Sequence, residues 1–335
     1  MVDVSTTYLG LRLGSPLVAS SSPLTETLAG VRELEDGGVG AIVLFSLFEE
    51  QLTLPPEALH RLMGEVAGSY AEAMATLPDA PRAHVGPFEY LDYIRAAKAA
   101  VDVPIIASVN GSPGGAWHPY CRLLEQAGAD GVELNLYHVP TDPEVSGERL
   151  EQDYFHTVRR VRESIRIPLA VKLHPFFTSL PHAARRFHDA GADGLVLFNR
   201  FYQPVVDLAH MRAKPKIELS DPEDLRLPLR WTSILSGQTK ADLAVTSGIH
   251  QAEDALSALA VGARVVMMCS ALLKHGPGHV KTVVQNMRVW LESRSYQRVD
   301  DFRGALLESS EARAALERAQ YMRALHGYDA SSGRS

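Results

Sequence analysis

A short glycine-containing pattern recurs along this chain, each time directly before an apolar run. The copies read GGVGAIVLF ending at Phe45, AGADGVELN ending at Asn135, AGADGLVLFN ending at Asn199 and VGARVVMMCS ending at Ser270. A glycine at this position is typical of a helix C-cap, and a continuous apolar run after it is typical of a strand buried on both faces. The repeat therefore predicts alternating helices and parallel strands.

A second set of apolar runs lies between these copies, with the sequences SPLVASS, VPIIASVN, IPLAVKLH and ADLAVTSG. Interleaving the two sets predicts eight strands, the number in a closed (β/α)8 or TIM barrel. We expect these strands near Leu17, Ile42, Ile105, Val132, Leu169, Val196, Leu243 and Val265, with helices at Trp117 to Ala127, Asp153 to Ser164, Pro181 to Ala190 and Ala252 to Val261. An open doubly wound sheet is the alternative, but it requires a glycine fingerprint after its first strand, which SSSPLTETLAG lacks.

Two connections are longer than one helix requires, from Ser46 to Val103 and from Arg200 to Ala241. Insertions on barrel loops tend to form lids and substrate pockets, so we expect both to cover the C-terminal mouth. The polar segment VKTVVQNMRVWLESRSY predicts an outer helix near the C-terminus. We expect residues 1–325 to form a single domain and residues 326–335 to form a disordered tail.

Composition argues against several classes of function. The chain has 33 Lys and Arg against 40 Asp and Glu, with no basic block, which does not suit a nucleic-acid surface. Cys121 and Cys269 are its 2 cysteines, too few for a disulfide framework, a zinc site or an iron–sulfur cluster, so we expect no metal. No signal segment and no apolar stretch of about 20 residues is present, and we expect a cytoplasmic protein without a membrane partner.

The segment from Asp242 to Leu273 predicts a phosphate-binding site. It reads as two strands joined by a helix, and small residues end each strand: Thr246, Ser247 and Gly248, then Cys269 and Ser270. The loops after the last two strands of such a barrel present backbone N–H groups that can bind a phosphate. We therefore expect a phosphorylated ligand, although many different chemistries share this feature.

Other strands also end in residues suited to a ligand: Ala19, Ser20, Asn110, Asn135, Lys172 and Asn199. An amide-rich ring suits a planar heterocycle, whereas the alternative role of each asparagine is to cap a helix. Lys172 lies among apolar residues in LAVKLH, so its burial requires a counter-charge. A reduced flavin supplies one near N1 and O2; the alternative is a side chain that extends to the barrel rim.

Along nearly its whole length the chain resembles the class 1 dihydroorotate dehydrogenase family of FMN-containing (β/α)8 barrels. Collinear segments carry the resemblance: TTYLGLRLGSPLVASSSPLT, EYLDYI, VELNL, AVKLHP, TSGI, CSALLKHGP and SYQRVDDFRG. The resemblance implies a homodimer. For the flavin ring, it implies contacts with Ala19 and Ser20 and places Lys172 at the pyrimidine edge. It also implies that Asn110, Asn135 and Asn199 hydrogen-bond flavin or substrate. The FMN phosphate would be held by Ser247, Gly248, Cys269 and Ser270.

The chain departs from the family at the substrate end. Phe45 replaces a lysine that family members usually have near flavin and substrate, and DAPRAHVGPFEYLDY lacks the asparagine of their substrate loop. His138 takes the position of the catalytic base. Because histidine titrates near neutrality, we expect His138 to act as the base, with Asn135 and Lys172 as further catalytic residues. His174 is a rival base, Tyr137 could serve as an acid, and an ordinary loop histidine is the alternative reading of His138.

Three functions follow from these observations. The favoured one is FMN-dependent oxidation of the CH–CH bond of dihydroorotate in pyrimidine biosynthesis. The others are an FMN oxidoreductase with a different substrate and a non-catalytic FMN- or phosphate-binding barrel that serves as an accessory subunit. The chain lacks a dinucleotide fingerprint and clustered cysteines, so we expect a soluble electron acceptor or a separate electron-transfer subunit.

Overall fold

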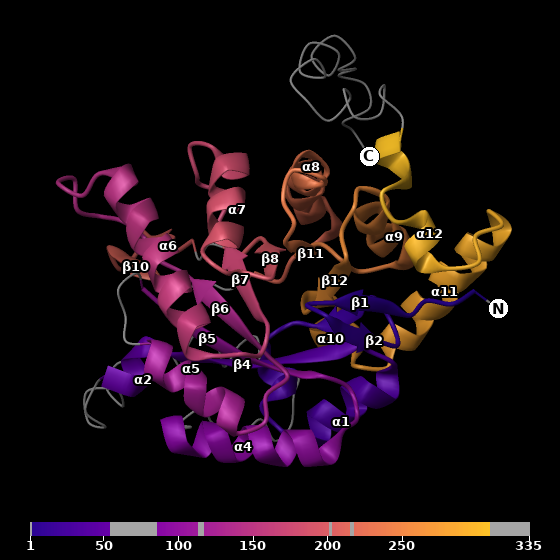
Figure 1. Cartoon of the computed structure of the whole chain (residues 1–335), viewed down its shortest axis with the longest axis horizontal. Helices are drawn as coiled ribbons and strands as arrows, with labels where there is room; N and C mark the ends of the chain where they lie inside the picture. Colours follow the sequence, from indigo (N-terminus) through magenta and orange to yellow (C-terminus); the bar gives the residue numbers. More distant parts are fainter. Residues whose placement is uncertain (1, 54–85, 113–116, 201–202, 215–217, 309–335) are drawn as a thin grey trace, which may run out of the picture.

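A closed barrel of parallel strands forms the centre of the computed structural model, which describes residues 2–53, 86–112, 117–200, 203–214 and 218–308 (Figure 1). The strands follow each other around the barrel in the order β11-β12-β3-β4-β5-β6-β7-β8. Their bounds are β3 (Leu17–Ala19), β4 (Ala41–Phe48), β5 (Ile105–Gly111), β6 (Gly131–Leu136), β7 (Leu169–Leu173), β8 (Gly194–Leu197), β11 (Asp242–Thr246) and β12 (Val265–Met268). Every strand expected from the repeat is present, and the predicted (β/α)8 barrel is confirmed.

Helices alternate with the strands and surround the barrel (Figure 1). The longer ones are α1 (Leu28–Gly37), α4 (Pro87–Ala100), α5 (Trp117–Gln126), α6 (Gly147–Ser164), α7 (Leu180–Asp189), α8 (Arg226–Leu235), α9 (Ala252–Ala260) and α11 (His279–Ser293). Short helices are η1 (Pro23–Thr25), α2 (Glu49–Thr53), η2 (Pro222–Leu225), α10 (Ser270–His275), α12 (Val299–Phe302) and η3 (Ala305–Glu308). The predicted outer helix is α11, which packs against α1 and α9.

The glycine repeat marks helix ends as expected. Gly38, Gly128, Gly191 and Gly262 all have positive φ, between 92° and 107°, the conformation in which glycine carries no steric penalty. One helix start differs from the prediction: α6 begins at Gly147 rather than near Asp153. The side chain of Ser146 accepts a hydrogen bond from the N–H of Arg149 and so caps a polar first turn that apolar periodicity does not reveal.

An N-terminal hairpin closes the amino-terminal end of the barrel. Its strands are β1 (Thr6–Tyr8) and β2 (Leu11–Leu13), and Tyr8, Leu9 and Leu13 pack against interior side chains such as Val43 and Met267. The Asp242 carboxylate at the start of β11 accepts a hydrogen bond from the Leu9 N–H at 2.8 Å. The sequence did not predict this hairpin, because its strands lie outside the glycine repeat and outside the apolar runs between its copies. Among the described residues, this hairpin covers the amino-terminal end of the barrel interior.

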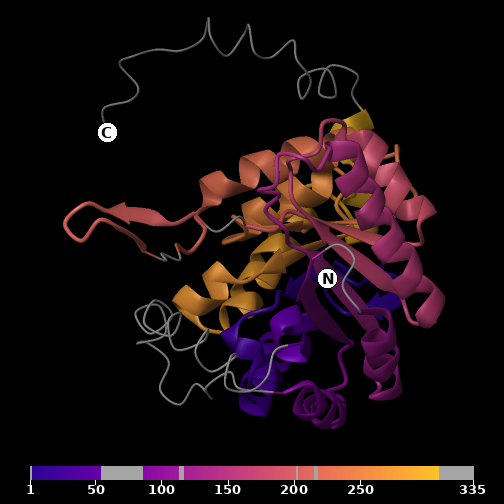
Figure 2. The ribbon, with the colours of Figure 1, turned by 90° about the vertical axis from the view of Figure 1, so that its left-hand side faces the viewer.

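The second long connection divides into two parts. Its strands β9 (Val205–Asp207) and β10 (Arg212–Lys214) form a hairpin that stands away from the body of the protein (Figure 2). This hairpin does not cover the mouth, contrary to our expectation for the whole insertion, and its Met211 side chain is exposed. The part that follows, with η2 and α8, lies against the barrel. Most of the first long connection and the predicted C-terminal tail fall outside the described residues.

None of the described helices combines the length and hydropathy that a membrane span requires.

Candidate active site

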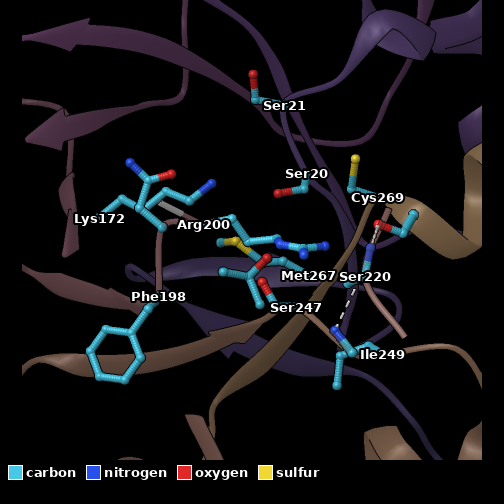
Figure 3. A pocket seen from close by; sticks show the side chains of 14 residues that line it. Ser20, Ser21, Lys172, Phe198, Arg200, Ser220, Ser247, Ile249, Met267 and Cys269 are labelled. Carbon is cyan, nitrogen blue, oxygen red and sulfur yellow. Dashed lines mark hydrogen bonds between the residues drawn. The ribbon is translucent and has the colours of Figure 1, made fainter. Parts of the chain in front are cut away.

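A pocket opens at the carboxyl ends of β3, β7, β8, β11 and β12 (Figure 3). The space between its lining atoms, part of it open to solvent, is about 540 Å³. The pocket brings together most of the predicted cofactor residues. The side chains that line it are Ser20, Ser21, Lys172, Phe198, Asn199, Arg200, Ser220, Thr246, Ser247, Gly248, Ile249, Met267, Cys269 and Ser270.

The predicted phosphate end of the pocket is held together by hydrogen bonds. The Ser220 N–H donates to Ser270 Oγ at 2.9 Å, and the Gly248 N–H donates to Ser220 Oγ at 3.3 Å (Figure 3). Lys274 Nζ donates to the Ser220 carbonyl at 3.0 Å. A single serine from the second insertion thus fixes the loops after β11 and β12 to each other.

The backbone at this end has an unusual conformation. Ser247 and Gly248 lie consecutively in the left-handed region, with φ of 76° and 74°. A non-glycine residue there costs roughly 1–3 kcal/mol and persists only where its surroundings enforce it, which is common at ligand sites. A Cβ on Gly248 would lie 2.4 Å from the Leu225 backbone nitrogen, so glycine is required. The strained backbone conformation of Ser247 thus lies where we expect the phosphate to bind.

Arg200 is a pocket residue that sequence reasoning missed. It directly follows Asn199 at the end of β8, and its side chain extends across the centre of the pocket in Figure 3. Its Nη1 lies 3.6 Å from Asp224 Oδ2 at the rim, where 43% of the arginine side chain is exposed. Arg200 and Ser220 belong to the long insertion, whose path a sequence does not reveal. The only available signal was the position of Arg200 directly after a strand.

Lys172 lies inside the barrel mouth, and the structure places a buried carboxyl group beside it. Its residue is 9% exposed, and its Nζ lies 3.8 Å from Oε1 of Glu133, which is 1% exposed. Glu133 was also missed, although the alternation in VELN places it on the same strand face as Asn135. The lysine does not extend to the rim.

The predicted amides gather on neighbouring strands. Asn199 Nδ2 donates to Asn135 Oδ1 at 2.7 Å, and Asn110 lies opposite Asn135 in the β5–β6 register. Asn135 is buried, so the contact with Asn199 satisfies a polar group that would otherwise be costly. Ala19, at the end of β3, is buried immediately before the pocket residue Ser20.

A register shift in β4 turns Phe45 out of the barrel. The shift lies between Val43 and Ser46. The Phe45 ring then packs against α4, with centroids 5.0 Å from Tyr90 and 5.5 Å from Tyr93. Phe45 is therefore not among the residues that line the pocket.

Ser46 faces the interior instead and joins a chain of hydroxyl groups. Its Oγ lies 2.8 Å from Ser108 Oγ and 3.2 Å from the Oγ of the pocket residue Ser21. At this side of the mouth the chain has hydroxyl groups that can donate or accept hydrogen bonds where relatives were expected to carry a positive charge.

The two candidate histidines differ in environment. His138 is half-buried in the loop after β6. Burial, with a smaller effect from His138, lowers the pKa of His174 to about 4. The His174 ring stacks on Phe177 at 4.4 Å, and its Nδ1 accepts a hydrogen bond from the Phe176 N–H. His174 is thus a neutral member of an aromatic stack near neutral pH.

This arrangement fits a phosphorylated planar ligand. Hydroxyl and backbone N–H groups form one end, whereas the Lys172 cation and the Asn135–Asn199 pair form another side. Met267 adds an apolar surface between them. A phosphate, a planar ring and a ring edge that can carry negative charge would each meet groups of suitable chemistry.

Comparison with known proteins identifies the family. Residues 84–291 match the family model described as dihydroorotate dehydrogenase. The chain is 27% identical to a putative dihydroorotate dehydrogenase A (fumarate) of Aeropyrum pernix, over 90% of this chain and 97% of the relative. It is 24% identical to the catalytic subunit of dihydroorotate dehydrogenase B (NAD(+)) of Thermoplasma acidophilum, over 92% and 100%. It is 22% identical to the chloroplastic dihydropyrimidine dehydrogenase (NADP(+)) of Arabidopsis thaliana, over 91% and 77%.

The matched segment contains Lys172, the asparagine pair and both phosphate-end loops, which is the part of the barrel that forms most of the pocket. The chain belongs to the dihydroorotate dehydrogenase family and is a flavin-dependent oxidoreductase of that type.

Proposed function

We propose that this protein binds FMN and oxidises the CH–CH bond of a reduced pyrimidine, with dihydroorotate as the leading substrate and pyrimidine biosynthesis as its setting. The observation that supports this best is the convergence of the phosphate end, Lys172 and Asn199 on one pocket. These groups come from the consecutive strands β7, β8, β11 and β12, which pair directly with one another and so bring their carboxyl ends together.

Each part of the pocket has a role in this proposal. Ser247, Gly248, Cys269 and Ser270 hold the phosphate, and Ser20 lies beside the ring. Lys172 stabilises negative charge at the pyrimidine edge. Asn135 and Asn199 orient flavin or substrate through the amide groups not used in their mutual hydrogen bond.

FMN supplies the hydride acceptor at its N5. The substrate loses one C–H bond as a hydride and a second as a proton, and a C=C bond forms. His138 removes the proton in this proposal, because a neutral imidazole accepts a proton near pH 7. The stacked His174, with its low pKa and an occupied Nδ1, is the weaker candidate.

The substrate is either dihydroorotate or an uncharged dihydropyrimidine. Relatives are named for both. Dihydroorotate has a carboxylate, whereas Phe45 packs outward and Ser46 and Ser108 place hydroxyl groups inside the barrel. Hydroxyl groups in place of a positive charge at this side of the mouth do not require a carboxylate on the substrate. An uncharged dihydropyrimidine is therefore the second candidate.

The electron acceptor is a soluble molecule or a separate subunit in our proposal. One relative is named with fumarate, and another is named as the catalytic subunit of an NAD(+)-dependent enzyme. We further propose a homodimer in the cytoplasm, with residues 1–325 as one domain.

The first test measures FMN and riboflavin binding by wild-type protein, R200A and the control R226A. Arg226 is an exposed arginine of the same insertion that pairs with Glu223 away from the pocket residues. We expect wild type and R226A to bind FMN more tightly than riboflavin. R200A should lose part of this preference, because the substitution removes a guanidinium group that extends into the pocket. Absence of FMN binding by wild type would contradict the cofactor assignment.

The second test mixes the FMN-loaded protein anaerobically with dihydroorotate or dihydrouracil. Bleaching of the flavin absorbance by dihydroorotate supports the leading substrate, and bleaching by dihydrouracil alone supports the second. An unchanged spectrum with both compounds would contradict the proposed reaction.

A further inference from the structure

Glu133 is a fully buried carboxyl group with an unusual lack of partners. It is 1% exposed, and neither side-chain oxygen has a hydrogen-bond partner among the described residues. It lies on β6 two residues before Asn135, so both side chains face the barrel interior. Unsatisfied buried polar atoms are rare in native proteins and require an explanation.

The groups that face Glu133 come from several elements. Lys172 Nζ on β7 is 3.8 Å from Oε1, which is ion-pair distance but beyond a normal hydrogen bond. Tyr8 on β1 approaches from the plugged end of the barrel, and its hydroxyl is also buried without a partner. The register neighbours Ser108 on β5 and Ala170 on β7 carry no charge.

Two other titratable groups lie farther out. Tyr90 on α4 donates to the Phe45 carbonyl and is outside the barrel wall. Asp242 on β11 accepts from the Leu9 N–H and pairs with Arg264, so its charge is compensated at the amino-terminal end. Lys172 is thus the one cation that faces Glu133 among these groups.

The balance of forces favours a proton on Glu133. An ionised carboxylate without hydrogen bonds in an apolar barrel pays a desolvation penalty that one ion pair seldom repays. Burial raises the pKa of Glu133, and the opposing effect of Lys172 does not cancel this rise. Lys172 reaches the open pocket, where solvent or a ligand can satisfy its ammonium group.

We propose that Glu133 is a positioning residue that remains a neutral acid, so that Lys172 directs an uncompensated positive charge into the pocket. An ionised Glu133 would make the pair neutral overall, whereas the neutral acid keeps a net charge of one. An anionic ring edge would then be stabilised by Lys172 at full strength. The part of this inference that concerns a bound flavin rests on the proposed function; the protonation of Glu133 does not.

The first experiment follows unfolding of the cofactor-free full chain between about pH 5 and pH 8 for wild type, E133Q and the control E163Q. Glu163 is an exposed glutamate on α6. A neutral native Glu133 keeps its proton where the unfolded chain has lost it, so wild-type stability falls relative to E133Q as pH rises. The ratio of the two unfolding constants should change by up to about tenfold per pH unit in this window. E163Q should show no such trend. A ratio that is independent of pH, or that changes in the opposite direction, would overturn the proposal.

A second comparison covers the case in which E133Q alone fails to fold. K172Q should retain most of its thermal stability at pH 7, because a neutral Glu133 is not left as an unpaired anion. Severe destabilisation of K172Q that E133Q rescues in the double variant would show an ionised Glu133 and overturn the proposal.

The flavin-loaded protein provides a readout of the charge itself. The two-electron reduction potential should be unchanged in E133Q and lower in K172Q. A higher potential in E133Q would mean that a negative charge had been removed and would overturn the proposal. Failure of wild type to bind FMN would contradict the proposed function, whereas the unfolding measurements would still decide the state of Glu133.

Discussion

The phosphate end of the pocket and the loop after β6 differ in how they are held in place. At the phosphate end, Ser220 connects the loops after β11 and β12 by hydrogen bonds, and Ser270 is 8% exposed. The loop that carries His138 continues through exposed residues, with Val139 at 51% exposure, and its Val145 N–H donates locally to Asp142. The binding end is fixed by tertiary contacts, whereas the proposed chemical end lies on a surface loop.

This difference reflects what each end must do. The phosphate group of a bound cofactor keeps the same shape whichever substrate is present. The backbone N–H groups that bind it can therefore be held in place before the cofactor arrives. A substrate loop on a rigid scaffold can change without loss of the barrel. The contrast fits our proposal, in which fixed loops hold the phosphate and His138, on a surface loop, is the base.

The largest expected effect is on the chemical end. H138Q should slow flavin reduction by the true substrate by roughly 10²- to 10⁴-fold, the usual contribution of a general base, with little change in FMN affinity. Anaerobic rapid mixing measures both. A wild-type rate in H138Q would remove His138 as the base. H174Q serves as the comparison, and a loss confined to that variant would transfer the role to His174.

The next effect is on the phosphate end. G248A should lower the free energy of unfolding by at least about 2 kcal/mol and reduce FMN retention, because the left-handed conformation alone costs roughly 1–2 kcal/mol for a non-glycine residue. The added Cβ would also meet the Leu225 nitrogen at 2.4 Å. G237A is the matched control, since Gly237 has φ of 80° and nothing within 4 Å of its Cβ position. Denaturant unfolding compares the two, and equal losses would mean that close packing at Gly248 contributes nothing.

The smallest effect is expected on the exposed loop. V139S should change the free energy of unfolding by no more than about 0.5 kcal/mol, as is usual for surface substitutions, and should leave FMN affinity unchanged. Thermal unfolding with and without FMN measures this. A larger loss would show that the loop is packed in solution and would weaken the contrast between the two ends.

Much of the fold could be predicted because its signals are local. The glycine repeat and the apolar runs between its copies together predicted all eight strands, since each glycine ends a helix and each apolar run must be buried on both faces. The residues at strand ends, such as Lys172 and Ser270, could be predicted with them, because parallel strands bring their carboxyl ends to one edge. The hairpin β1–β2 and the hairpin β9–β10 could not, since their strands lie outside the glycine repeat and outside the apolar runs between its copies.

The sequence by itself determined the barrel, the phosphate-loop pattern and the identity of the side chains that end each strand. Only the tertiary structure decided which of them meet. The register shift in β4 turned Phe45 outward and Ser46 inward, and the path of an insertion brought Arg200 and Ser220 into the pocket. The register between β6 and β7 placed Lys172 beside Glu133. Local patterns record the period and caps of one element, whereas register and loop path depend on contacts between residues far apart in the chain.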